Sequence, residues 1–232
     1  MDEALHEMRQ RLEAARGEPL ESMAGFFDAR VETYEAHMAR WHRHYRWMAR
    51  LLPPGVKTLL DVGCGTGLEL DRIFERFPDA EVTGVDLSEK MLARLAEKHA
   101  GRKLTLLRAD YFACDLGEER FDAAVSFETL HHYPAAQKTA LFAKLRRALR
   151  PGGCYLECDY IAPSRAAEEA AMAECARRRA EGGVPEGAFV HFDTPLTLEH
   201  ELQALRGAGF AAAELVGYLP GDPHTAMLRA VR

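Results

Sequence analysis

Two stretches of this chain concentrate the residue types that bind ligands and move protons. The first places Asp61 two positions ahead of three glycines at alternate positions, Gly63, Gly65 and Gly67. Glycine has no Cβ and lets a ligand lie against bare backbone, and the start of a following helix offers unpaired N–H groups. The pattern therefore predicts a loop that holds a nucleotide-like cofactor.

The second stretch, residues 127–134, includes Phe127, His131, His132 and Tyr133. Histidine titrates near neutral pH, so His131 and His132 are candidate general bases. A helix-capping or packing role is the alternative for each of them. No metal is expected here, because the two histidines are adjacent and the HExxH spacing of many zinc sites is absent.

Alternating strands and helices would position both stretches. The strands predicted at 58–62 and 121–126 end where the two stretches begin. Ligands of open α/β sheets bind beyond the carboxyl ends of the strands, so both stretches should lie at one edge of the sheet. The other predicted strands are 80–85, 104–107, 154–157, 210–216 and 225–231, and helices are predicted near 2–16, 27–52, 70–77, 88–99, 141–149, 164–181 and 197–205.

Length and composition restrict the class of protein. The 232 residues, 47% of them hydrophobic, suffice for one sizeable core. A net charge of −6 argues against a broad nucleic-acid or anionic-membrane surface, and no apolar run reaches the length of a membrane span. Five cysteines, an odd number, fit reduced thiols better than a disulfide framework. We therefore expect a soluble cytoplasmic protein with no nucleic-acid or membrane partner.

The aspartate followed by GxGxG resembles the first motif of the class I S-adenosylmethionine-dependent methyltransferases. Asp86, at the end of the second predicted strand, and the sequence LRPGG at 149–153 strengthen the resemblance, which covers about residues 55–232. It implies an α/β, doubly wound Rossmann-like sheet of seven strands, mostly parallel with an antiparallel last strand. It also implies S-adenosyl-L-methionine as cofactor and S-adenosyl-L-homocysteine as product. Nicotinamide-binding folds use GxGxxG instead.

The resemblance also implies roles for single residues in holding the cofactor. Asp86 should accept hydrogen bonds from the ribose hydroxyls, and Asp110 should accept one from the adenine amino group, with a turn-forming aspartate as its alternative. Asp61 should anchor the loop or meet the amino group of the cofactor through water. The full set of expected cofactor contacts is Tyr34, Asp61, Gly63, Cys64, Gly65, Gly67, Leu68, Asp86, Leu87, Met91, Ala109, Asp110, Tyr111 and Phe127.

Residues 1–54 are predicted to form an N-terminal helical cap on a methyltransferase domain at 55–232, and a helical insertion is predicted at about 163–196. Apolar residues at helical spacing make 27–52 one continuous helical stripe, for which plain packing is the main interpretation. In many small-molecule members of the family that the chain resembles, such helices supply the acceptor pocket. The residues then expected to contact the acceptor are His37, Trp41, Tyr45, Tyr133, Asp159, Tyr160 and His191.

The function expected from the resemblance is transfer of a methyl group to an oxygen, nitrogen or sulfur atom of a small-molecule acceptor by in-line displacement. Two alternatives remain open, a non-catalytic S-adenosylmethionine-binding partner or sensor and an RNA methyltransferase. A nicotinamide oxidoreductase shares the doubly wound fold but not the glycine spacing. The sequence gives no preference for a particular acceptor or for a monomer over a homodimer.

Overall fold

The computed structural model describes residues 3–14, 17–185 and 187–232. The strands are β1 (Thr58–Val62), β2 (Glu81–Asp86), β3 (Lys103–Arg108), β4 (Phe121–Phe127), β5 (Leu149–Tyr160), β6 (Ala212–Leu219) and β7 (Asp222–Val231). The helices are α1 (Glu3–Ala14), α2 (Met23–Met38), the short 3₁₀ helix η1 (Ala39–Trp41), α3 (His42–Leu51), α4 (Leu68–Arg76), α5 (Glu89–Lys98), α6 (Ala135–Ala148), α7 (Arg165–Glu181) and α8 (Leu198–Gly207).

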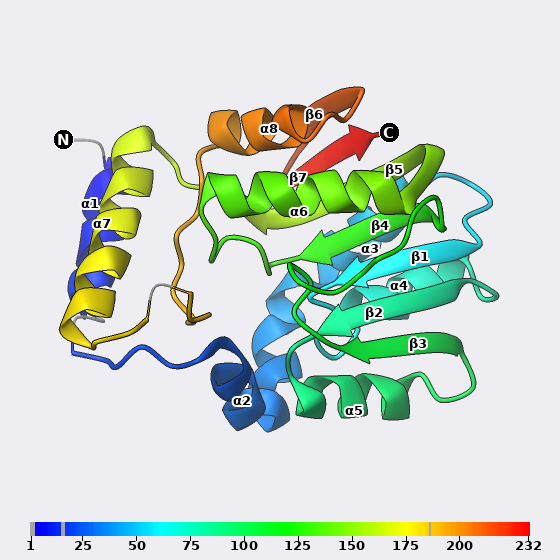
Figure 1. Cartoon of the computed structure of the whole chain (residues 1–232), viewed down its shortest axis with the longest axis horizontal. Helices are drawn as coiled ribbons and strands as arrows, with labels where there is room; N and C mark the ends of the chain where they lie inside the picture. The colour runs from blue at the N-terminus through cyan, green and yellow to red at the C-terminus, as the bar shows by residue number, and fades with distance from the viewer. Residues whose placement is uncertain (1–2, 15–16, 186) are drawn as a thin grey trace.

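Within the described residues the strands form one seven-stranded sheet in the order β3-β2-β1-β4-β5-β7-β6. The strands β1 to β5 pair in parallel, whereas β7 runs antiparallel to both β5 and β6. The parallel strands all point toward the side of the molecule where α1 and α7 lie (Figure 1). The predicted Rossmann-like fold with an antiparallel last strand is confirmed.

Helices cover both faces of the sheet and create two apolar cores. Successive residues of a strand point to opposite faces, and β1 shows this directly. Leu60 belongs to the core with Phe142 of α6, while Leu59 belongs to the core with Met48 of α3 and Ile73 of α4. The parallel strands are apolar on both sides for this reason, as expected for a sheet buried between two helical layers.

The N-terminal helix and the inserted helix form a pair of their own. α1 packs against α7 at the end of the molecule toward which the parallel strands point (Figure 1). The helix predicted at 2–16 is present from Glu3 to Ala14, and residues 2, 15 and 16 lie outside the described part. After α7 the chain returns to the sheet, where the backbone N–H of Thr194 donates to the carbonyl of His131 at 2.7 Å.

The prediction of one continuous helix over 27–52 is wrong. α2 ends at Met38, the chain tightens into the 3₁₀ turn of η1, and α3 begins at His42. The hydroxyl of Tyr45 donates to the Met38 carbonyl at 3.4 Å, so a side chain seven residues further along contacts the end of α2. The break redirects the chain, so that α2 reaches the site while α3 packs on α4.

The LRPGG sequence was expected to follow the end of a helix, but in the structure it forms the start of strand β5. Leu149 already pairs with Phe121 of β4, and the next paired residues are Ala123 and Cys154, so residues 150–153 bulge out of the ladder. Gly152 has a φ of +77°, which only glycine adopts without strain. The fifth strand is therefore longer than the predicted 154–157. In the described part of the chain, no helix combines the length and apolar character needed to cross a membrane.

Candidate active site

The glycine loop lies between the carboxyl end of β1 and the start of α4. Gly63, Gly65 and Gly67 have φ values of 68°, 47° and 69°, in the left-handed region that favours glycine. A Cβ on Gly65 would lie 3.3 Å from the hydroxyl of Tyr34, and one on Gly63 would lie 2.1 Å from Oγ1 of Thr129. The loop therefore needs glycine both for its backbone angles and for its close neighbours.

Asp86 at the end of β2 fixes the shape of the glycine loop. Its Oδ2 accepts the N–H of Gly65 at 2.9 Å, and its Oδ1 accepts the N–H of Ser88 at 2.8 Å. Burial raises the pKa of Asp86, and these backbone donors act in the opposite direction. The ribose-binding role of Asp86 stays a prediction. The geometry adds a second role, because the same carboxylate holds the loop.

Asp61 is a fully buried carboxyl group at the base of the loop. Neither of its oxygens has a hydrogen-bond donor among the described residues. Burial raises its pKa well above the usual value, and the neighbouring carboxyl of Glu69, whose own pKa burial raises to about 7, raises it further. A buried carboxyl without a donor, placed beside a second carboxyl, fits a cationic ligand group such as the ammonium of S-adenosylmethionine.

A narrow pocket runs beside the loop and is lined by many of the expected cofactor residues. Its predicted lining residues are Tyr34, Gly63, Gly65, Asp86, Leu87, Met91, Tyr111 and Phe127. Met23, Ala24 and Phe27 of α2 also line it, as do Ser88, Glu128 and Thr129. Met23, Ala24 and Phe27 could not be predicted, because only the tertiary fold brings α2 to the loop.

Other expected cofactor residues do not line this pocket. Oδ1 of Asp110 accepts the N–H of Phe112 at 2.8 Å, which is the turn-forming alternative. Cys64 is buried with its sulfur against Gly84, and Ala109 donates its N–H to the carbonyl of Asp86 at 3.0 Å.

Two further expected residues act as structural supports of the loop. Gly67 caps α4, and Leu68 packs against the core on the α4 face. Both therefore shape the loop from the protein side, and their contact with the cofactor stays a prediction.

His131 follows β4 and is held from the end of β5. Its Nδ1 lies 2.5 Å from Oδ1 of Asp159, while Oδ2 of Asp159 accepts the N–H of Leu130 at 2.8 Å. Burial alone would lower the pKa of His131, but the Asp159 carboxylate more than offsets this, and the net shift is upward. Asp159 is buried beside the histidine and orients its ring, and its contact with an acceptor stays a prediction.

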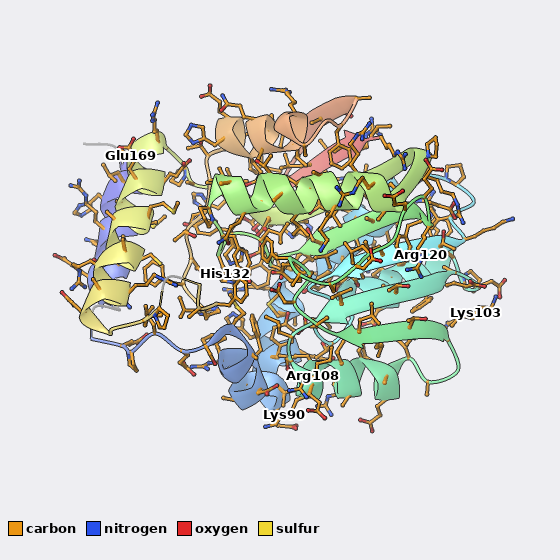
Figure 2. The ribbon with its side chains drawn as sticks, viewed as in Figure 1. Lys90, Lys103, Arg108, Arg120, His132 and Glu169 are labelled. Atoms are coloured by element: carbon orange, nitrogen blue, oxygen red, sulfur yellow. The ribbon has the colours of Figure 1, made fainter. Side chains whose placement is uncertain are left out.

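His132 and Asp193 complete a polar cluster with His131. Oδ1 of Asp193 lies 3.5 Å from Nε2 of His131 and 3.3 Å from Nδ1 of His132. Nδ1 of His132 also lies 3.2 Å from the carbonyl oxygen of Phe192. Burial lowers the pKa of His132, and the neighbouring His131 lowers it further. Figure 2 shows His132 at the edge of the sheet toward which the strands point, opposite Lys103.

Glu128 is a site residue that the sequence reasoning missed, although it lies within the second stretch. It has a φ of 47°, an unusual angle for a residue with a side chain. Its Oε1 is buried without a partner among the described residues, and burial raises its pKa to about 8. Asp193 was also missed, because it is sixty residues from the histidines and only the loop after α7 brings it to them.

Two cavities adjoin the cluster. One has a volume of about 450 Å³ and the other about 470 Å³, and Arg40, Trp41, Glu128, His131 and Asp193 line both. Of the expected acceptor residues, His37 and His191 line the first, Tyr160 lines the second and Trp41 lines both.

Tyr45 and Tyr133 pack against aromatic rings in this structure. The ring of Tyr45 lies 4.4 Å from that of Phe127, and the ring of Tyr133 lies 4.6 Å from that of Phe112. Both tyrosines are buried and line neither of the two cavities. Their expected contacts with an acceptor stay predictions.

Three features define a nucleotide-binding α/β fold of the methyltransferase type. They are the strand order, the antiparallel β7, and a glycine loop bonded to a carboxylate at the end of β2. A family model described as a methyltransferase domain matches residues 59–153. A putative O-methyltransferase of Nostoc punctiforme has the same fold, with a TM-score of 0.72 at 20% identity over 99% of this chain and 69% of that one.

Relatives with higher sequence identity carry methyltransferase names. The chain is 35% identical over 127 residues to an uncharacterized methyltransferase of Mycobacterium tuberculosis, an alignment that covers 53% of this chain and 62% of the relative. It is 30% identical to an O-methyltransferase of Penicillium expansum over 72% of this chain and 56% of the relative. The chain thus spans less than two thirds of these relatives. The family model and these relatives identify residues 59–153 as a methyltransferase domain.

Proposed function

We propose that the protein transfers a methyl group from S-adenosylmethionine to a hydroxyl or amine of a small-molecule acceptor. One observation carries the proposal: the pocket beside the glycine loop and the two larger cavities share a wall. Glu128 lines all three spaces, and Tyr34 and Phe27 line both the loop pocket and the first cavity. A cofactor on one side and an acceptor on the other would therefore meet at Glu128.

The size and lining of the cavities favour a small acceptor. Volumes of about 450 and 470 Å³ lie in the range of small-molecule sites, roughly 300–1,000 Å³. The lining combines aromatic rings such as Trp41 with a few charged groups, which is typical of sites that orient one compact ligand. The O-methyltransferase name of the Penicillium expansum relative also supports an oxygen acceptor.

The residues of the chain would divide the work of the reaction. Bound S-adenosylmethionine supplies an electrophilic methyl group on a sulfonium and leaves as S-adenosylhomocysteine. Asp61 would hold its ammonium group, and Asp86 would hold its ribose hydroxyls. Aligning two reactants in this way contributes up to about 7–11 kcal/mol in the best model reactions.

A hydroxyl or protonated amine must also lose a proton, and a positioned base accelerates this step. His131 is oriented for it by Asp159, with the Nδ1 of His131 turned to the carboxylate and Nε2 on the cavity side near Asp193. His132 lies beside it, with a ring-centroid distance of 4.1 Å. The two predicted bases therefore lie together on the cavity wall.

Two measurements test the proposal. Calorimetry should detect binding of S-adenosylhomocysteine at micromolar concentrations, and a screen of metabolite extracts with methyl-labelled cofactor should transfer label to a small molecule. Failure to bind the cofactor would contradict the whole proposal. Binding without transfer to any acceptor would favour a non-catalytic sensor, and transfer to RNA alone would favour the nucleic-acid alternative.

A further inference from the structure

The cluster of His131, His132 and Asp193 has the composition of a metal site. One nitrogen from each histidine and one oxygen of Asp193 all lie within 4.8 Å of one another. Two imidazoles and a carboxylate are the donor set of many zinc and non-haem iron(II) sites. The three residues come from the segment after β4 and from the loop after α7, so the fold assembles the set from distant parts of the sequence.

The spacing within the cluster fits ligands that share one ion. Zinc lies roughly 2.0–2.2 Å from nitrogen and oxygen ligands in a tetrahedral arrangement, which places neighbouring ligand atoms about 3.3–3.5 Å apart. Oδ1 of Asp193 lies 3.5 Å from Nε2 of His131 and 3.3 Å from Nδ1 of His132. The carbonyl oxygen of Phe192, 3.2 Å from the same Nδ1, is a further oxygen donor at this position.

The surroundings of His131 support the same interpretation. A histidine that binds a metal usually donates its other ring N–H to a carboxylate, which fixes the tautomer and the ring orientation. Asp159 meets Nδ1 of His131 at 2.5 Å and is itself held by the N–H groups of Leu130 and Tyr160. This arrangement leaves Nε2, the nitrogen that faces Asp193, as the ligand atom.

We propose that His131 Nε2, His132 Nδ1 and Asp193 bind one divalent transition-metal ion of the zinc or iron(II) type. Three protein side chains leave a coordination position open, as catalytic zinc sites do. The cluster lines the cavity assigned to the acceptor, and the Asp193 side chain is 52% exposed there.

The role of the ion, unlike its binding, rests on the proposed function. In that cavity the ion would bind a hydroxyl oxygen of the acceptor and lower its pKa, so that the proton passes to solvent water and the metal-bound His131 does not act as the base. The sequence-based expectation of no metal considered only the adjacent histidines, and the fold adds Asp193 to them.

Titration of the metal-stripped full-length protein with Co²⁺ tests the proposal without cofactor or acceptor. One equivalent should bind and produce visible absorption bands, and Zn²⁺ should displace it. Asp193→Asn and His132→Ala should each weaken Co²⁺ binding about tenfold or more, and Asp159→Asn should weaken it by roughly 10–100-fold through loss of the orienting carboxylate. His42→Ala, which removes an exposed histidine elsewhere, should bind Co²⁺ like the wild type.

Binding of S-adenosylhomocysteine to the same variants separates this proposal from the proposed function. Asp193→Asn should retain cofactor affinity, because Asp193 does not line the pocket beside the glycine loop. Its exposed side chain also makes this variant the least disturbing to the fold. Absence of stoichiometric Co²⁺ binding, or binding that survives both Asp193→Asn and His132→Ala unchanged, would overturn the metal site while leaving the cofactor site intact.

Discussion

Asp86 accepts a hydrogen bond from the backbone N–H of Gly65 at 2.9 Å, and this contact ties the end of β2 to the middle of the glycine loop. The bond makes the loop shape depend on a residue two elements further along the chain. Because the same carboxylate is expected to meet the ribose, loop geometry and cofactor recognition are joined in one side chain.

Asp86→Asn is therefore expected to weaken S-adenosylhomocysteine binding about 10- to 100-fold. Asparagine has one acceptor oxygen, so it cannot serve Gly65 and Ser88 together, and a lost hydrogen bond to a charged group costs about 1.5–3 kcal/mol. Isothermal titration calorimetry measures the effect. Asp79→Asn, at an exposed position before β2, is the matched control, and an equal loss in both variants would contradict the role of Asp86.

Gly65→Ala should abolish measurable cofactor binding while the protein stays folded. The new Cβ would lie 3.3 Å from the Tyr34 hydroxyl at a φ of 47°, so the loop must shift where the cofactor lies. Gly183→Ala is a strained control, because Gly183 has a φ of +61° and nothing within 4 Å of the new Cβ. Both variants should lose similar stability in thermal unfolding, and only Gly65→Ala should lose affinity.

The parts of the fold that depend on local sequence pattern could be predicted. The strand leading to Asp61, the cap at Ser88 and the glycine loop are each signalled by residues within a few positions of one another. The break after Met38 could not be predicted in this way. It depends on Tyr45 reaching back to a carbonyl and on packing against the sheet, whereas the apolar spacing continues unbroken through both helices.

Residues of the site could likewise be predicted only where the signals lie close together in the sequence. His131 was found because its residue type and its place after a strand are both local signals. Asp193 joins it only through the path of the loop after α7, where Thr194 bonds to the His131 carbonyl. Sequence spacing carries no information about such a contact, so the cluster became visible only in three dimensions.

Asp61→Asn should stabilise the protein and weaken cofactor binding at the same time. Because the buried carboxyl has no donor among the described residues, replacing it with a neutral amide removes the cost of ionising a carboxyl in the interior, a gain of roughly 1–3 kcal/mol. The loss of charge removes the partner expected for the cofactor ammonium. Chemical denaturation and calorimetry on one preparation test both effects, and an unstable variant with full affinity would contradict them.

The Asp61 and Glu69 pair also gives the wild type a specific pH dependence. The folded-state pKa of Glu69 is about 7, above its ordinary 4.5, so the folded chain binds more protons than the unfolded chain between these values. Stability contributed by the protonated carboxyl is thus lost as pH rises through about 7. S-Adenosylhomocysteine affinity should rise over the same interval, because the ionised pair attracts the ammonium. Glu69→Gln, which removes the titrating carboxyl, should flatten both curves between pH 6 and 8.

Lys138 of α6 forms ion pairs that link helix α8 and strand β5. Its Nζ lies 2.5 Å from Oε2 of Glu201 on α8 and 3.7 Å from Oε1 of Glu157 on β5, and all three side chains are fully buried. Burial alone would lower the pKa of Lys138, but the two carboxylates raise it above the usual value. The ammonium is therefore charged, and it compensates acidic groups that would otherwise be buried alone.

Lys138→Met should cost about 3–5 kcal/mol of unfolding free energy at pH 7, because removing one partner leaves buried carboxyl groups uncompensated. Adding Glu157→Gln and Glu201→Gln should recover most of that loss. The single variant should also be less destabilised at pH 5, where protonation neutralises the carboxyls.

Lys103→Met, which removes an exposed pair with Glu81, should cost about 1 kcal/mol or less. Urea unfolding measures all of these variants, and equal losses for Lys138→Met and Lys103→Met would show that the buried triad has no special part in joining α6, α8 and β5.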